Sequence, residues 1–196
     1  MSEGKSILLV GVGGQGILLA SEVISQAAMN QGFDVKKSEI HGMAQRGGVV
    51  SSHVRYAKRV YSPLIRKGMA DVLVSFEKAE GYRWIEYLKD GGEIITNTTE
   101  IVPPILNVMG KKYPHDVLDK MREQGLDVLA IDAASVAEKL GNVRAMNVVL
   151  LGAISSKLDF TEETWKEAIK SRVPKKHVEL NLKAFDGGRA LGQGDR

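Results

Sequence analysis

The sequence of 196 residues contains no cysteine, and this absence excludes several kinds of chemistry at once. Without thiolates the chain cannot ligate an iron–sulfur cluster, form a disulfide or use a thiol nucleophile. Only four histidines are present, and no two of them form a close pair: His41, His53, His115 and His177. Because a structural zinc site needs a tighter grouping of ligands, we expect no metal on this chain.

Long apolar runs are missing as well. No run of apolar residues reaches the roughly 18 that a membrane-spanning helix requires. The first residues also lack the basic and then apolar layout of a secretory signal. These two absences predict a cytoplasmic location.

Net charge is small, at +3, and therefore gives no indication of a nucleic-acid or membrane partner. Its distribution is uneven, however. Residues 1–70 carry nine Lys or Arg against four Asp or Glu, whereas residues 71–160 carry ten against fourteen. The positive segment also holds the glycine-rich motifs, which favours an anionic ligand there; a solvated surface with scattered charge is the simpler alternative.

Apolar runs that alternate with helical patterns predict a three-layer α/β/α fold, Rossmann-like, with a mostly parallel, mixed sheet. Strands are expected at residues 6–10, 33–38, 49–56, 71–76, 92–96 and 127–131. Helices are expected at residues 17–31, 77–88, 114–124, 133–140, 146–158, 161–171 and 175–185. The strict alternation in residues 49–56 favours a half-exposed, antiparallel strand. We expect one α/β domain over residues 1–186 and a mobile, glycine-rich tail over residues 187–196.

A glycine turn is the first motif that carries chemistry. It follows an apolar strand and opens a helix, as dinucleotide-binding turns do. Glycines let an anion approach the backbone amides at the positive end of a helix. The carboxylate expected at the end of the second strand is not in place, because Asp34 begins that strand and Lys36 and Lys37 end it. The turn predicts a site for a phosphate or other anion, with a purely structural turn and a self-sufficient NAD site as alternatives. Its candidate binding residues are Gly11, Gly13, Gly14, Gln15 and Gly16.

An irregular, glycine-rich loop over residues 39–48 is the second motif. It lies where the second strand ends, which is where α/β sheets bind their ligands. The guanidinium fork of Arg46 and the amides beside it can hold a carboxylate or phosphate together. The candidate residues are Gln45, Arg46, Gly47 and Gly48. An exposed turn with an ordinary surface arginine is the alternative, and His41 is more simply a hydrogen-bonding residue than an acid–base group.

Asn147 is the last candidate, a polar residue at the start of an otherwise apolar helix. Capping or a hydrogen bond in the core explains it most simply, and contact with a ligand is the second interpretation. We find no residue on this chain to which a catalytic role can be assigned.

Together these motifs resemble a known family. The turn GVGGQG followed by ILLASEV is similar to the gamma-type component of the 2-oxoacid:ferredoxin oxidoreductases. The loop EIHGMAQRGG running into VVSSHVR resembles the version found in beta subunits of indolepyruvate:ferredoxin oxidoreductases, and RAMNVVLLGA fits the same pattern. Other gamma components carry Tyr-Gly-x-Glu-x-Arg-Gly-Gly in this place. Only Arg46, Gly47 and Gly48 match that wording, which argues against the pyruvate, 2-oxoisovalerate and 2-oxoglutarate branches.

The resemblance implies a reaction and a division of labour. An aryl 2-oxoacid such as indolepyruvate is decarboxylated on thiamine diphosphate with Mg, electrons pass through iron–sulfur clusters to ferredoxin, and the acyl group goes to coenzyme A. In the family, the thiamine diphosphate and the clusters belong to a larger, cysteine-rich alpha subunit. This chain would then be an obligatory subunit that completes the active site and is inactive alone. A free-standing NAD(P)-dependent dehydrogenase and a non-catalytic nucleotide-binding regulator are the alternative functions.

Overall fold

The computed structural model describes residues 4–41, 48–103, 106 and 108–194. In these residues the chain forms an α/β fold around a six-stranded mixed sheet. The strands are β1 (Lys5–Val12), β2 (Asp34–His41), β3 (Val49–Ala57), β4 (Ala70–Ser75), β5 (Leu88–Asn97) and β6 (Asp127–Ile131). The helices are α1 (Ile17–Asn30), α2 (Lys78–Arg83), α4 (Val117–Glu123), α5 (Ala133–Lys139), α6 (Met146–Ser155), α7 (Glu162–Arg172) and α8 (Val178–Gly194).

The order of the strands is β2-β3-β1-β4-β5-β6. The pairs β1–β4, β4–β5 and β5–β6 are parallel, and β3 is antiparallel to both of its neighbours. All strands except β3 therefore point the same way, and their carboxyl ends share one edge of the sheet. The predicted α/β fold with a mostly parallel, mixed sheet is confirmed.

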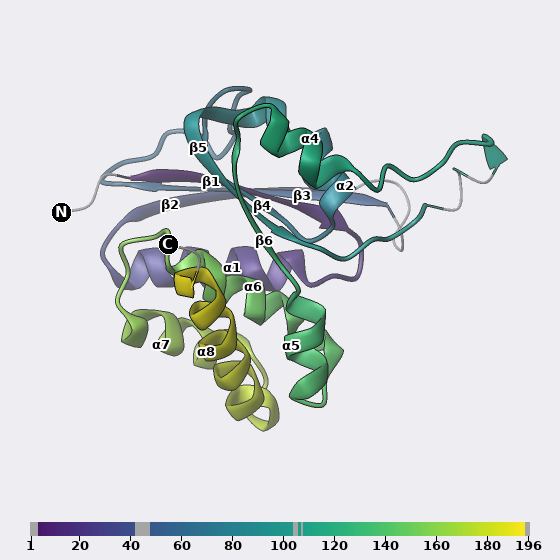
Figure 1. Cartoon of the computed structure of the whole chain (residues 1–196). Helices are drawn as coiled ribbons and strands as arrows, with labels where there is room; N and C mark the ends of the chain where they lie inside the picture. Colours follow the sequence, from purple (N-terminus) through teal and green to yellow (C-terminus); the bar gives the residue numbers. More distant parts are fainter. Residues whose placement is uncertain (1–3, 42–47, 104–105, 107, 195–196) are drawn as a thin grey trace.

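Helices cover both faces of the sheet, which gives three layers (Figure 1). Helices α1, α5, α6, α7 and α8 lie below the sheet in this view, and α2 and α4 lie above it. The larger core lies between the sheet and the lower helices, where Leu9, Val74, Leu150 and Trp165 are among its fully buried side chains. Because the helix after β1 and the helix after β4 cover opposite faces, a crevice opens between the carboxyl ends of these two strands.

Strand β3 departs from the expectation of a half-exposed strand. Most of its residues are buried, including those on the face that alternation marks as polar. The reason is its position between β1 and β2, with α1 on one face and the loop after β3 on the other. His53 is buried there, and its Nδ1 accepts a hydrogen bond from the Ile65 amide at 3.1 Å. Burial lowers the pKa of His53, so the neutral imidazole is the form that fits this contact.

Three predicted boundaries are wrong. Strand β2 continues to His41, so the irregular segment does not begin at residue 39. The helix expected over residues 77–88 is the short α2 followed by a 3₁₀ turn over residues 85–87, and β5 begins at Leu88. Pairing with a neighbouring strand extends both β2 and β5 beyond their apolar runs, because backbone hydrogen bonds stabilise a strand whatever its side chains are.

The predicted glycine-rich tail from residue 187 is also wrong. Helix α8 continues to Gly194, and Gly188 is buried against α6. A Cβ atom on Gly188 would lie 1.8 Å from the carbonyl oxygen of Val149, and one on Gly152 would lie 2.1 Å from that of Phe185. These glycines therefore let the backbones of α6 and α8 approach closely, and their number reflects helix packing rather than a tail.

Candidate functional site at the carboxyl edge of the sheet

The glycine turn lies at the carboxyl end of β1, as the sequence predicts. Gly14 and Gly16 have φ angles of 99° and 79°, a conformation that residues with a side chain rarely adopt. A Cβ atom on Gly14 would meet no atom within 4 Å, so the turn is open to approach at this point. No described side chain caps the first turn of α1, and its amide groups face the site without an internal partner.

The turn and the second motif meet in the structure. The amide of Gly13 donates to the carbonyl oxygen of Gly48 at 2.9 Å, and Val12 pairs with Val49 at the start of β3. The start of β3 and Gly48 before it thus lie beside the glycine turn. Gln45, Arg46 and Gly47 themselves lie outside the described residues, and their candidate role stays a prediction.

Gln15 is buried and bridges the crevice between β1 and β4. Its Oε1 accepts a hydrogen bond from the Val12 amide at 2.7 Å, and its Nε2 donates to the Phe76 carbonyl oxygen at 2.7 Å. Both partners are backbone groups at the ends of adjacent parallel strands. The structure therefore gives Gln15 a role in holding the turn in place, and its predicted contact with a ligand is untested.

Asn147 lies below the turn, at the start of α6. It is buried, and its Nδ2 donates to the Gly16 carbonyl oxygen at 3.5 Å. A Cβ atom on Gly16 would come 2.4 Å from the same Nδ2 atom. Gly11 is similarly enclosed, since a Cβ atom there would lie 2.7 Å from Oε1 of Gln15. Support of the turn from below accounts for Gly11, Gly16 and Asn147, while Gly13, Gly14 and Gly48 form its open side.

Strand order bears directly on the alternative of an NAD site. A dinucleotide fold places the strand after the first helix next to β1, so that a carboxylate at its end reaches the ribose. Here β3 lies between β1 and β2, so β2 is two strand spacings, about 10 Å, from the turn. Asp34 begins β2 and accepts from the Val60 amide, and Glu39 pairs with Lys37 at 2.7 Å. Neither carboxylate is placed to hold a ribose at the turn.

A second group of side chains lies at the end of β4, on the other side of the crevice. The carboxylate of Glu77 is buried, accepts from the Glu80 amide at 2.8 Å and also accepts from the Tyr113 hydroxyl. Burial and the Glu77 carboxylate raise the pKa of Tyr113, so this phenol keeps its proton and donates. Burial also raises the pKa of Glu80, whose Oε1 lies 3.3 Å from the Arg83 guanidinium.

Two cavities flank the glycine turn along this edge. One, of about 430 Å³, is lined by the turn itself, the first residues of α1 and Val50. The other, of about 710 Å³, lies between Val12, Gly48 and Val49 on one side and α2 on the other, where Ile101, Pro103, Leu106, Tyr113 and Pro114 complete its wall. Val12 borders both, so the open side of the turn separates two hollows of a size that accepts small molecules.

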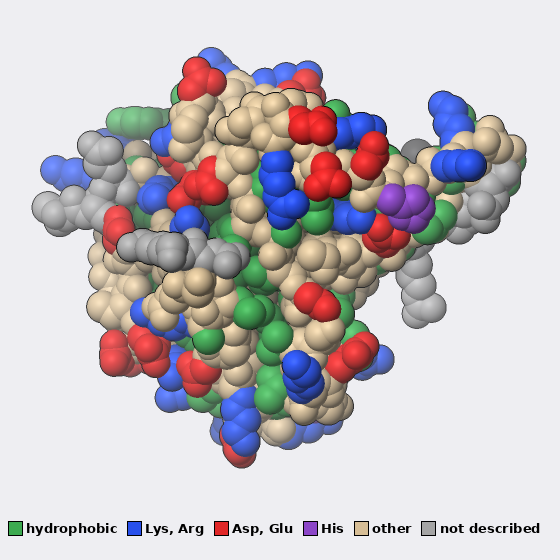
Figure 2. All heavy atoms as spheres, viewed as in Figure 1, with side chains coloured by type: hydrophobic (Ala, Val, Ile, Leu, Met, Phe, Trp, Pro, Cys, Tyr) green, Lys and Arg blue, Asp and Glu red, His purple; other side chains and the backbone are tan. Residues whose placement is uncertain are grey.

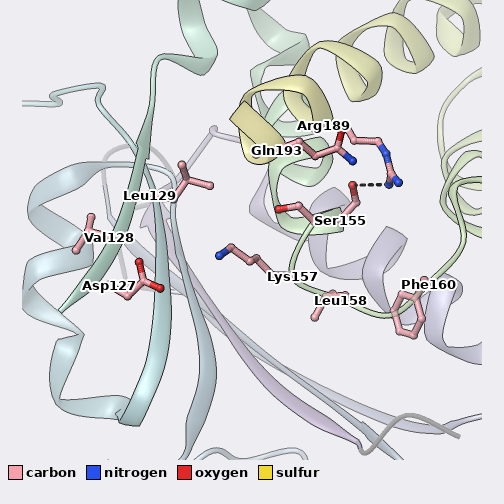
Figure 3. Close-up of a pocket in the computed structure, with 11 residues that line it drawn as sticks. Asp127, Val128, Leu129, Ser155, Lys157, Leu158, Phe160, Arg189 and Gln193 are labelled. Atoms are coloured by element: carbon pink, nitrogen blue, oxygen red, sulfur yellow. Dashed lines mark hydrogen bonds between the residues drawn. The ribbon is translucent and has the colours of Figure 1, made fainter. Parts of the chain in front are cut away.

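A further cavity, of about 450 Å³, lies away from this edge (Figure 3). It is bordered by the start of β6, the end of α6 and the last turns of α8. Its two cations already have partners: Lys157 pairs with Glu93 at 2.8 Å, and Arg189 donates to Ser155 Oγ at 3.2 Å. Because it lies at the amino end of β6, it is outside the region where α/β sheets bind their ligands.

The sequence did not single out Glu77, Glu80 or Tyr113. The available signal was a charged pair, Glu77-Lys78, directly after an apolar strand, at a carboxyl end where ligands are expected. Tyr113 had no such signal, because its approach to Glu77 depends on the return of the chain after residue 103.

Neither a metal site nor a cluster site forms in the part of the chain that the structure describes. No grouping of three or more acidic or histidine side chains occurs there that could hold a metal ion. The whole sequence has no cysteine to bind a cluster. In the same described residues, no helix combines the length and apolar character needed to cross a bilayer. The fold and site thus define an α/β chain with an open glycine turn and no cysteine to bind an iron–sulfur cluster.

Comparison with known proteins gives the family. The chain matches the family described as pyruvate ferredoxin/flavodoxin oxidoreductase over residues 6–191, and it belongs to that family. It is 42% identical over 189 residues to the indolepyruvate oxidoreductase subunit IorB of Thermococcus kodakarensis, with 93% of each chain covered. The resemblance seen in the sequence is therefore confirmed.

Solved structures agree on the fold. The gamma subunit of a keto/oxoacid ferredoxin oxidoreductase from Geobacter sulfurreducens is 25% identical, with a TM-score of 0.72 over 97% of this chain and 99% of that one. A 2-oxoglutarate:ferredoxin oxidoreductase from Magnetococcus marinus, 23% identical, has a TM-score of 0.78. The match covers all of this chain but only 32% of that protein's chain. In that protein the fold is therefore one part of a longer polypeptide.

Proposed function

We propose that this chain is the smaller, beta-type subunit of an indolepyruvate:ferredoxin oxidoreductase and is active only in complex with a larger, cysteine-rich alpha subunit. Identity of 42% along 93% of a chain named as such a subunit carries the proposal. The absence of cysteine from the sequence supports it, because the electrons of this reaction need clusters that the chain cannot bind.

The complex would oxidatively decarboxylate indolepyruvate and other aryl 2-oxoacids, transfer the acyl group to coenzyme A and pass the electrons to ferredoxin. Thiamine diphosphate, when bound, supplies the means of stabilising the carbanion left by decarboxylation. Among the residues that the structure describes there is no grouping of ligands for that cofactor's Mg, and the sequence has no cysteine for a cluster. We therefore place both on the alpha subunit, and the whole complex in the cytoplasm.

The part played by this chain lies at the carboxyl edge. The open side of the glycine turn lies beside the positive end of α1, where the uncapped amides of the first helical turn are available to an anion, whereas the Gly13 amide is bonded to the Gly48 carbonyl oxygen. By sequence Arg46 follows β2, and we propose that its guanidinium acts together with these amides. Such a set favours an anion, which in this reaction means a phosphate of coenzyme A or a carboxylate of the oxoacid.

A free-standing NAD(P)-dependent dehydrogenase is the second candidate, favoured only by the sequence pattern of the glycine turn. Strand β3 between β1 and β2 counts against it, because it places the carboxylates of β2 two strand spacings, about 10 Å, from the turn. Titration of the isolated chain with NADH, followed by fluorescence, separates the two functions. Saturable binding at micromolar concentrations would favour the dehydrogenase. The same titration tests the regulator, with ATP in place of NADH.

Reconstitution tests the proposed function directly. The purified chain is expected to be colourless and to show no oxidation of indolepyruvate with ferredoxin or a viologen dye. Co-expression with the proposed larger, cysteine-rich subunit should give a brown complex that reduces the dye only when indolepyruvate and coenzyme A are both present. The larger subunit alone serves as the control, and turnover by the smaller chain alone would contradict the proposal.

Replacement of Arg46 tests the loop. We expect Arg46→Ala and Arg46→Lys to lower kcat/KM of the assembled complex about tenfold or more, which corresponds to the loss of a charge-assisted hydrogen bond of about 1.5–3 kcal/mol. Lysine is a poor substitute because an ammonium cannot reproduce the bidentate fork. Arg59→Ala is the matched control, since Arg59 is exposed after β3 at the opposite edge. A complex with Arg46→Ala that assembles and turns over normally would remove Arg46 from the site.

A further inference from the structure

An arm of the chain leaves the body between β5 and α4 (Figure 1). It comprises residues 100–115, of which 100–103, 106 and 108–115 are described, and it extends beyond the sheet at the carboxyl edge. On its inner side it forms one wall of the cavity of about 710 Å³ beside the glycine turn. The arm is thus attached to the candidate site but is not needed to cover the core.

Both ends of the arm are fixed to the start of α2. On the outgoing side, Glu100 forms an ion pair with Lys78. On the returning side, Lys78 Nζ donates to the His115 carbonyl oxygen at 2.9 Å, and His115 Nδ1 lies 3.0 Å from a Glu100 oxygen. The hydrogen bond from Lys78 lowers the pKa of Glu100, which keeps the pair charged. Together with the bond from Tyr113 to buried Glu77, these contacts hold the base of the arm in one position.

Three of the described residues of the arm expose apolar side chains to solvent. Val108 is 82% exposed, Met109 56% and Val102 48%. Apolar side chains that a folded chain holds out into solvent on a projecting segment are typical of a surface that another protein covers. Two exposed lysines, Lys111 and Lys112, follow directly, and the outer end of the arm is correspondingly rich in basic side chains (Figure 2).

We propose that the arm is the element by which this chain docks on the larger subunit. Val102, Val108 and Met109 enter an apolar depression on that subunit, and acidic residues at its rim face Lys111 and Lys112. The proposal depends on the proposed function, which supplies the larger subunit. Beyond that function, the proposal specifies that the arm makes the contact and that the receiving surface of the larger subunit is apolar with an acidic rim.

Two observations favour the larger subunit over a second copy of this chain. First, the arm lines the cavity beside the glycine turn, which the active centre of the larger subunit would adjoin. A single contact through the arm would therefore position the cavity and that active centre against each other. Second, two copies meeting arm to arm would bring Lys111 and Lys112 of one against those of the other, and like charges at an interface repel. A partner with acidic groups at the rim has no such penalty.

The double variant Val108→Asp with Met109→Asp tests the apolar contact. In the co-expressed complex we expect the dissociation constant to rise at least tenfold, measured by sedimentation or by titration of the separated subunits. Because both side chains are exposed, the melting temperature of the isolated chain should stay within about 2 °C of the parent. Tyr61→Asp is the matched control: Tyr61 is 84% exposed at the opposite edge, and its variant should assemble like the parent.

Charge at the rim is tested by Lys111→Glu with Lys112→Glu. Association with the larger subunit should slow several-fold at low ionic strength, and the difference from the parent should shrink in high salt, where rim charges are screened. Normal assembly of both double variants would overturn the docking proposal. If the isolated chain forms a dimer, and Val108→Asp with Met109→Asp dissociates it, the arm binds a second copy of this chain instead. If the parent chain itself fails to bind the larger subunit, the proposed function fails first, and the docking proposal with it.

Discussion

Gly188→Ala is expected to lower the free energy of unfolding by about 2–3 kcal/mol, within the range that overpacking a core costs. The added methyl group would lie 1.8 Å from the Val149 carbonyl oxygen and 2.6 Å from its carbonyl carbon. Because these are backbone atoms of α6, no side-chain rotation can relieve the clash, and the two helices must move apart. Gly152→Ala opposes the Phe185 carbonyl oxygen in the same contact, so the two substitutions should not be additive.

Denaturant unfolding of the purified chain measures this effect, and Gly194→Ala is the control. A Cβ atom on Gly194 would meet no atom within 4 Å. Alanine is also favoured over glycine in helices by up to about 1 kcal/mol. Gly194→Ala should therefore be neutral or slightly stabilising. Equal, small effects at Gly188 and Gly194 would show that α8 does not pack on α6 at this distance and would return residues 187–194 to a tail.

Gln15→Leu should be costly for both stability and activity. Leucine fills a similar volume but leaves the Val12 amide without its hydrogen bond and the Phe76 carbonyl oxygen with only a 3.4 Å contact from Asn97. A buried polar group left unpaired costs about 1–3 kcal/mol, so the loss of two such bonds predicts about 2–5 kcal/mol. The turn also loses its tie to β4, and we expect activity of the assembled complex to fall at least tenfold.

Measuring both quantities in the same variant separates support from ligand contact. Gln124→Leu is the control, because Gln124 is exposed and makes only a 3.4 Å contact with the Tyr82 hydroxyl. If Gln15→Leu lost activity but kept its stability, Gln15 would bind a ligand rather than hold the turn. Unchanged stability and activity together would contradict the bridging role seen in the structure.

Much of the architecture was predictable from local sequence. The strand at residues 127–131 and the first helix were located within about a residue, because a run of five residues is too short for a helix and the longer segment repeats its apolar residues at helical spacing. The start of α1 at Ile17 agrees with the helix predicted after the glycine turn, whereas the left-handed conformation of Gly14 and Gly16 is seen only in the structure. Residues 187–194 were predicted as a tail but belong to α8. Glycine lowers helix propensity, and only packing on α6 compensates for it here.

The sequence by itself determined that this protein carries no cluster, that its fold is α/β, that a glycine turn opens its first helix, and that it belongs with the 2-oxoacid oxidoreductases. These properties depend on residue types and on contacts between near neighbours in the chain. Tertiary structure alone decided that β3 separates β2 from β1, that Gln15 ties the turn to Phe76, and that Tyr113 reaches Glu77 to fix the arm. Each of these is a contact between residues at least 36 positions apart or a choice among strand orders. Local patterns leave such choices open because they specify which face is buried, not which neighbour buries it.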